Sequence, residues 1–111
     1  MNYPFDRSEY RIPYPPSARP RITIAGEVRE VVDCSEQGLR YVAEAGRVPE
    51  TGAKVSGMVR LVSGGAPINV TGVVVRIQEG EVALQLDSPG ISVQRVFQEQ
   101  RYLGRHFPAR Q

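Results

Sequence analysis

The spacing of apolar residues changes twice along the chain, and each change marks a different kind of element. Between residues 21 and 86, short β-branched runs alternate with turn signals, as is typical of strands. Near the end of this region Val82, Leu84 and Leu86 share one face, which is the two-residue period of a half-buried strand. The predicted strands are 21–24, 27–32, 38–42, 55–62, 70–77 and 81–86. Six strands at this turn spacing predict a small antiparallel barrel or sandwich.

Beyond residue 90 the period becomes helical. Val93, Val96 and Phe97 fall on one face, Ser92 is a suitable N-cap, and Gly104 is a suitable stop. The sequence therefore predicts a helix over residues 92–103. Because a single helix cannot bury its apolar stripe alone, we expect it to pack on the sheet or to cover an open end of the barrel.

The first twenty residues show neither period. They contain five prolines, which fix φ and remove backbone donors, so this segment is predicted to be extended, mobile and outside the core. We accordingly divide the chain into a flexible arm over 1–20, a folded domain over 21–104 and a tail over 105–111. The prolines are Pro4, Pro13, Pro15, Pro16 and Pro20.

Length and composition fit one folded domain in a reducing compartment. The chain has 111 residues, 41% of them hydrophobic, which is enough for one modest core. No run approaches the roughly 18 apolar residues of a membrane span, and no apolar signal segment follows Met1. Cys34 is the only cysteine, so no internal disulfide can form. We expect a cytoplasmic protein without a membrane span, either a monomer or a weak dimer.

The net charge of +2 is unevenly distributed. Residues 1–21 and 95–111 are basic, whereas residues 22–94 hold nine acidic and six basic side chains. Apart from Lys54 the basic residues are arginines, whose planar fork binds phosphate or a guanine edge with two hydrogen bonds. A general preference for arginine codons explains this excess equally well. The small total does not require a large DNA or RNA footprint.

Residues that usually carry catalysis or bind metals are scarce. The only histidine, His106, lies beyond the predicted helix, and no second cysteine accompanies Cys34, which excludes the usual Cys/His zinc sites. Cys34 itself is expected to be a small buried side chain. The glycine-rich turn 63–65 lacks the Lys-Ser/Thr of a phosphate loop, so a hairpin turn is its expected use. The sequence therefore predicts no enzyme, no metal site and no resident cofactor.

Two short polar motifs remain. An R-x-x-x-R motif places Arg7 and Arg11 in the arm. A D-x-S-x-x-G motif places Asp33, Ser35 and Gly38 at a turn between two strands. Each motif alone is a weak signal, because two arginines four apart are common and the second motif is also a good turn sequence. Their order, with 22 residues from Arg11 to Asp33, is much more specific.

In these motifs the chain resembles the PilZ family, whose ligand signature is R-x-x-x-R followed at about this distance by [D/N]-x-S-x-x-G. The run 38–42 looks like the strand that follows the second motif, and 72–76 and 82–86 look like the family's late hairpin. The resemblance covers roughly residues 7–103 and implies an all-β fold, a six-stranded antiparallel barrel with a C-terminal helix. One departure is Asp6, where many members have a further arginine, and this change would lower ligand affinity.

The resemblance also implies a function. PilZ domains bind the second messenger cyclic di-GMP, so we expect a receptor or adaptor that changes conformation with its ligand. Its target would be an unidentified protein partner in motility, biofilm or exopolysaccharide control, and neither DNA nor RNA would be bound. Ordering of the arm around the ligand is the expected conformational change.

The chemistry of the motif residues suits this ligand. Guanine O6 and N7 accept a bidentate arginine, while its N1–H and N2–H groups suit the carboxylate of Asp33. Ser35 would donate to the ligand or brace the turn, and Gly38 leaves room for it. Arg76 would stack on the base or, equally, be a solvated strand residue. The predicted ligand residues are Arg7, Arg11, Asp33, Ser35, Gly38 and Arg76.

Two alternatives stay open. A PilZ fold that has lost its ligand would serve as a protein adaptor, although such members usually lack the motif pair. A barrel that binds single-stranded nucleic acid would expose aromatic side chains on its strands, and only Tyr41 is so placed.

Overall fold

A computed structural model of the protein describes residues 11–44 and 46–108. Within these ranges the chain forms seven strands and one helix, which follows them. The elements are β1 (Ile12–Pro13), β2 (Arg21–Ile24), β3 (Glu27–Cys34), β4 (Gly38–Val42), β5 (Lys54–Arg60), β6 (Ile68–Gln78), β7 (Glu81–Leu86) and α1 (Val93–His106).

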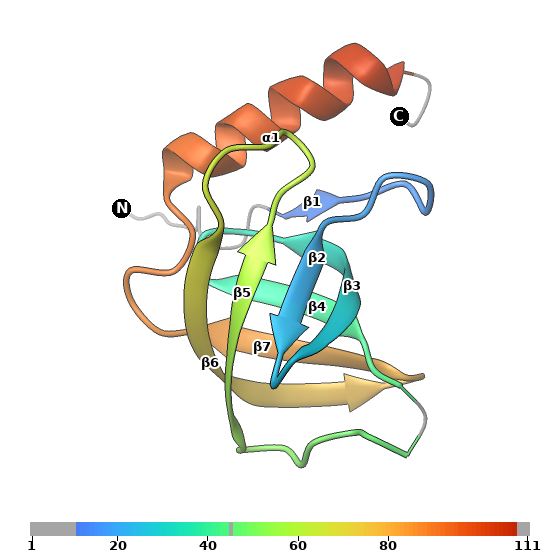
Figure 1. Cartoon of the computed structure of the whole chain (residues 1–111), viewed down its shortest axis with the longest axis vertical. Coiled ribbons are helices and arrows are strands. Elements are labelled where there is room, and N and C mark those ends of the chain that lie inside the picture. The colour runs from blue at the N-terminus through green and yellow to red at the C-terminus, as the bar shows by residue number, and fades with distance from the viewer. Residues whose placement is uncertain (1–10, 45, 109–111) are drawn as a thin grey trace, which may run out of the picture.

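Six of these strands close into a barrel (Figure 1). Their order around it is β3-β2-β5-β6-β7-β4, and β4 then pairs with β3 to complete the circuit. The six pairings are all antiparallel, and in four of them a short connection such as the turn 79–80 joins the two strands directly. The predicted six-stranded antiparallel barrel with a C-terminal helix is confirmed.

Alternate strand positions fill the interior of the barrel. Ile22, Val31 and Val59 are completely buried, and each is flanked along its strand by more exposed residues, as a two-residue period requires. Burying a side chain of this size stabilises the fold by about 1.5–3 kcal/mol. At Gly72 of β6 no side chain fits, because a Cβ there would lie 2.6 Å from the carbonyl oxygen of Gln85 in β7.

Helix α1 lies across one end of the barrel (Figure 1). It begins as predicted, since the hydroxyl of Ser92 accepts a 3.2 Å hydrogen bond from the backbone N–H of Arg95. The prediction that Gly104 stops it is wrong. Gly104 lacks the positive φ of a glycine stop, and the helix continues until the N–H of Phe107 bonds to the carbonyl of Leu103. No helix in the described part of the chain is long and apolar enough to cross a membrane.

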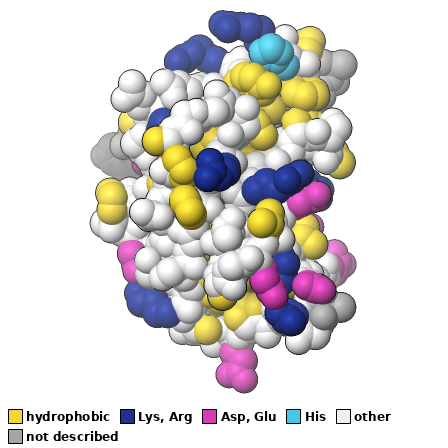
Figure 2. Space-filling model, in the orientation of Figure 1, with side chains coloured by type: hydrophobic (Ala, Val, Ile, Leu, Met, Phe, Trp, Pro, Cys, Tyr) yellow, Lys and Arg dark blue, Asp and Glu magenta, His cyan; other side chains and the backbone are white. Residues whose placement is uncertain are grey.

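The end of the molecule formed by α1 is basic. Figure 2 shows basic side chains and the single histidine at this end, while over the barrel acidic side chains lie among further basic ones. The helix carries Arg95, Arg101 and Arg105, and its one acidic residue, Glu99, is fully buried. The uneven charge along the sequence therefore becomes an uneven charge over the surface.

Residues 11–20 contribute to the core, so the prediction that the whole segment 1–20 lies outside it is wrong. Ile12 and Tyr14 are only 2% and 6% exposed, and β1 pairs with β3. The backbone N–H of Tyr14 also donates to the carbonyl of Val32 at 3.1 Å. Proline does not prevent this, because Pro13 lies in an edge strand that does not need its missing N–H. The predicted mobility of the first ten residues falls outside the described ranges, and the domain limits stay a prediction.

Candidate functional site

The two sequence motifs meet at the end of β3. The carboxylate oxygen Oδ1 of Asp33 accepts a 3.3 Å hydrogen bond from Nη1 of Arg11. Strand β1 brings Arg11 to this point, because Ile12 and Pro13 pair with the last two residues of β3. A separation of 22 residues in sequence is thereby converted into direct contact. Arg7, the other arginine of the first motif, lies outside the described residues.

The D-x-S-x-x-G motif forms the tight turn from β3 into β4. The backbone N–H of Ser35 donates to the carbonyl of Gly38 at 2.8 Å, and its hydroxyl donates to the same oxygen at 3.5 Å. The side chain of Ser35 is completely buried, so in this structure it braces the turn. A Cβ on Gly38 would lie 3.2 Å from Oγ of Ser35 and 3.6 Å from Nη1 of Arg11. The bare α-carbon of Gly38 therefore lets the Arg11 guanidinium lie close against the turn.

Asp33 also belongs to a row of four residues that crosses four neighbouring strands. The register pairs Asp33 with Arg40, Arg40 with Ala83, and Ala83 with Arg76. A break in register of the β-bulge kind precedes Asp33 in β3, and another precedes Arg76 in β6. Val31 and Val74, two residues earlier in each strand, point into the barrel. With strict alternation Asp33 and Arg76 would point inward as well, but the extra residue at each bulge turns them to the outer face.

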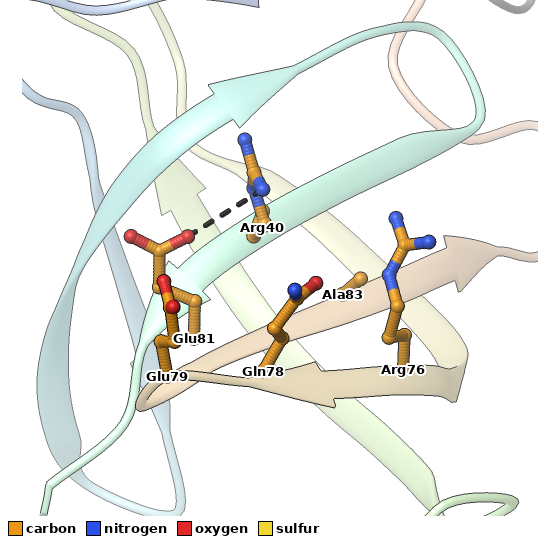
Figure 3. A pocket seen from close by; sticks show the side chains of 6 residues that line it. All are labelled: Arg40, Arg76, Gln78, Glu79, Glu81 and Ala83. Carbon is orange, nitrogen blue, oxygen red and sulfur yellow. Dashed lines mark ion pairs between the residues drawn. The ribbon is translucent and has the colours of Figure 1, made fainter.

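A shallow pocket lies on this outer face between Arg40 and Arg76 (Figure 3). The two arginines come from β4 and β6, and because Ala83 between them has only a methyl group, open space separates their guanidinium groups. The cavity volume is about 160 Å³. Arg76 is exposed and faces the pocket from the side away from Asp33. The remaining lining residues are Gln78, Glu79 and Glu81.

Arg40 is a site residue that the sequence analysis does not single out. Its Nη2 donates to Oδ2 of Asp33 at 2.5 Å, and its Nη1 lies 3.5 Å from Oε1 of Glu81. Its Nε is buried and has no hydrogen-bond partner among the described residues. One signal was available: Arg40 is the single charged residue in the otherwise apolar run 38–42, where alternation turns it outward.

Two ionisable side chains in the core beneath the site, the thiol of Cys34 and the hydroxyl of Tyr14, stay neutral. Cys34 is 1% exposed, and burial raises the pKa of its thiol from 9.0 to about 12. Burial likewise raises the pKa of the Tyr14 hydroxyl, which lies 3.5 Å from the Cys34 sulfur. A thiol of this kind is not a nucleophile near neutral pH. The prediction that Cys34 is a small buried side chain is confirmed.

The structure does not support the alternative of a surface that binds single-stranded nucleic acid, because the aromatic side chain expected to stack on bases is buried. Tyr41, the one strand aromatic available for base stacking, is 4% exposed and belongs to the hydrophobic core. Stacking on nucleic acid requires an exposed ring face. The described strands therefore offer no platform of this kind.

Comparisons with known proteins agree with this architecture. A solved structure of an uncharacterised Legionella protein, Lpg0364, is similar to the chain at 11% sequence identity and a TM-score of 0.57, covering 90% of this chain and 92% of that one. The Bacillus subtilis inhibitor of motility MotI/DgrA is similar at 16% identity and a TM-score of 0.57, covering 85% of this chain and 49% of that protein. At these identities the likeness shows the fold alone. No curated protein matches the sequence.

The comparison with protein families shows the family of the chain as well as its fold. The family model described as PilZ domain matches residues 5–102, a range that includes both motifs, the six barrel strands and most of α1. The chain belongs to the PilZ domain family.

Proposed function

We propose that this domain is a receptor for cyclic di-GMP, which binds where the two motifs meet and alters how the domain contacts a protein partner. The observation that carries the proposal is the contact between Arg11 and Asp33 beside the bare α-carbon of Gly38. A turn alone does not require an arginine from a distant segment at this place. Membership of the PilZ family supports the same ligand. The similar fold of MotI/DgrA, named as an inhibitor of motility, is compatible with a signalling role.

The site offers the groups that guanine needs. Guanine presents O6 and N7 as acceptors and N1–H and N2–H as donors. The side chain of Arg11 is 47% exposed and would bind the acceptors, while the carboxylate of Asp33 would bind the donors. Arg76 would stack on the base from the other side of the pocket, a contact worth about 0.5–2 kcal/mol. The role of Ser35 would be to hold the turn in shape.

The pocket is large enough for only part of a cyclic dinucleotide. Its volume of about 160 Å³ lies below the roughly 300–1,000 Å³ of a pocket that encloses a small ligand. We therefore propose that residues before Arg11, including Arg7, cover the rest of the ligand. Ordering five such residues costs about 5–10 kcal/mol, and each charge-assisted hydrogen bond returns about 1.5–3 kcal/mol. Binding of roughly micromolar strength would follow, and the reordered segment would be the surface that a partner in motility, biofilm or exopolysaccharide control detects.

Isothermal titration of the whole chain with cyclic di-GMP and with cyclic di-AMP tests the proposal. Adenine has a donor where guanine has O6 and lacks N1–H, so the guanine ligand should bind about tenfold or more tightly, the discrimination expected of a good bidentate contact. Equal binding of the two ligands would contradict the assigned base contacts. A folded chain that binds neither ligand would instead support the ligand-free adaptor.

A further inference from the structure

Both carboxylate oxygens of Asp33 already have partners in the structure. Oδ1 accepts a hydrogen bond from Arg11 at 3.3 Å, and Oδ2 accepts one from Arg40 at 2.5 Å. The Asp33 side chain is only 5% exposed, so the two guanidinium groups leave little of it open to a ligand. A guanine that donates from N1–H and N2–H requires both oxygens along one edge. Each oxygen can accept a second hydrogen bond, so the obstacle is burial: with the side chain 5% exposed, one arginine must move before a base can reach Asp33.

Of the two arginines, Arg40 is the one that has a second carboxylate partner within reach. Its Nη1 is already 3.5 Å from a second carboxylate, that of Glu81. Arg11 pairs with no carboxylate other than Asp33 in the part of the chain described. The present position of Arg40 also leaves its buried Nε without a hydrogen bond, which native structures generally avoid. If Arg40 moves toward Glu81, it loses the ion pair with the Asp33 carboxylate and keeps an ion pair with the Glu81 carboxylate. The guanidinium group therefore has a negatively charged partner in both positions.

We infer that Arg40 exchanges carboxylate partners and thereby controls access to Asp33. In the free protein it pairs with Asp33, since a buried carboxylate without a partner is strongly unfavourable. With ligand bound, Glu81 holds Arg40 at the edge of the pocket, as the geometry in Figure 3 allows, and Asp33 is free to bind guanine. The inference rests on the proposed function, and it makes Arg40 and Glu81 positioning residues for the ligand.

Substitution of Glu81 separates this inference from simple electrostatics. Glu81→Gln removes a negative charge near an anionic ligand, which by charge alone should tighten binding. If Glu81 holds Arg40 in the bound state, the same change should instead weaken cyclic di-GMP binding about two- to fivefold, the effect of a partly exposed ion pair. Glu79→Gln is the matched control, because Glu79 lines the same pocket and has no ion pair among the described residues. It should bind cyclic di-GMP as tightly as the unmodified chain, or more tightly.

A double-mutant cycle then tests whether Glu81 acts through Arg40. In an Arg40→Gln background the further change Glu81→Gln should no longer weaken binding and should act as Glu79→Gln does, because the residue that Glu81 holds is gone. If Glu81→Gln and Glu79→Gln behave alike, or if the effect of Glu81→Gln persists without Arg40, the exchange of partners is wrong while cyclic di-GMP binding stands. If the unmodified chain fails to bind cyclic di-GMP, the proposed function falls and this inference with it.

Discussion

The hydroxyl of Tyr14 donates a 2.6 Å hydrogen bond to Oε2 of Glu99 and so joins the segment before β2 to helix α1. Glu99 is completely buried, and its carboxylate also accepts the backbone N–H groups of Val62 and Ser63 at 3.1 and 2.8 Å. Three segments far apart in sequence therefore share one buried carboxylate. Because Tyr14 follows Arg11 by three residues, the proposed ligand-binding segment and the helix are held at the same group.

Removal of the Tyr14 hydroxyl should destabilise the fold. Tyr14→Phe deletes a hydrogen bond to a buried carboxylate and leaves that oxygen with one partner fewer, so the free energy of unfolding should fall by about 1.5–3 kcal/mol in urea titrations. Tyr102→Phe is the matched control, because Tyr102 is a half-buried tyrosine on α1 with no hydroxyl hydrogen bond within the described part of the chain. Its substitution should change stability by less than about 0.5 kcal/mol. Equal effects of the two changes would contradict the role of the Glu99 contact.

Two glycines should respond to alanine with opposite signs. Gly104 lies in the exposed part of α1, and a Cβ there meets nothing within 4 Å, so Gly104→Ala should stabilise the fold by about 0.5–1 kcal/mol. Gly72→Ala should destabilise it by about 1–3 kcal/mol, since its Cβ would lie 2.6 Å from the backbone oxygen of Gln85. Thermal melts of both variants provide the measurement. A loss of stability in Gly104→Ala would show that this glycine has a function in ending the helix after all.

The buried thiol of Cys34 makes stability depend on alkaline pH. The folded-state pKa of about 12 lies above the ordinary value of 9.0, so between these pH values the unfolded chain releases a proton that the folded chain keeps. The contribution of Cys34 is therefore complete below about pH 9 and is lost as the pH rises toward 12, by up to about 1.4 kcal/mol for each pH unit.

Comparison with Cys34→Ala isolates this effect, because Tyr14 also keeps its proton in the folded state and contributes its own slope at higher pH. Urea titrations at about pH 8, 9.5 and 10.5 should show that the unmodified chain loses stability faster than the variant does. Parallel slopes for the two chains would mean that the Cys34 thiol ionises in the folded protein as easily as in the unfolded chain.

Much of the fold could be predicted because period and turn chemistry are local properties. The alternation in 81–86 and the helical spacing after Ser92 are visible in the sequence, and both elements form as predicted, apart from the helix end. The failure at residues 11–20 has a physical cause. Ile12 and Tyr14 lie on either side of Pro13 and are both buried, which is a strand pattern, and an edge strand tolerates the proline between them.

The candidate site was predictable in its components and not in its geometry. The motifs predict that Arg11 and Asp33 belong to one ligand site, and the structure brings their side chains into direct contact, which the sequence does not predict. The outward direction of Asp33 and Arg76 depends on the two β-bulges, and the residues inserted there, Val32 and Val75, are ordinary strand formers that carry no sequence mark of a bulge. Arg40 was missed for a related reason, since only the pairing of β3 with β4 places it against Asp33.

The proposed site makes a definite prediction for the motif residues. Arg11→Ala and Asp33→Ala should each weaken cyclic di-GMP binding by about 1.5–3 kcal/mol, the range for a hydrogen bond to a charged group. Asp33→Ala should also reduce the preference for cyclic di-GMP over cyclic di-AMP, because the carboxylate is the group proposed to recognise N1–H and N2–H of guanine. Asp33→Asn keeps one acceptor oxygen and replaces the other with a donor, so its affinity should lie between those of the unmodified chain and Asp33→Ala.

The control for these changes is an arginine with similar exposure and no place in the site. Arg60 is exposed on β5, a strand that pairs with neither β3 nor β4, and it has no ion pair among the described residues. Arg60→Ala should alter cyclic di-GMP affinity only by a small electrostatic amount that disappears as salt is raised, whereas the loss in Arg11→Ala should persist, because the contact to the base is direct. Titrations at low and high salt, with thermal melts to confirm folding, therefore distinguish a ligand contact from a general effect of positive charge. If Arg11→Ala and Arg60→Ala lose affinity equally at both salt concentrations, Arg11 does not contact the ligand and the site assignment is wrong.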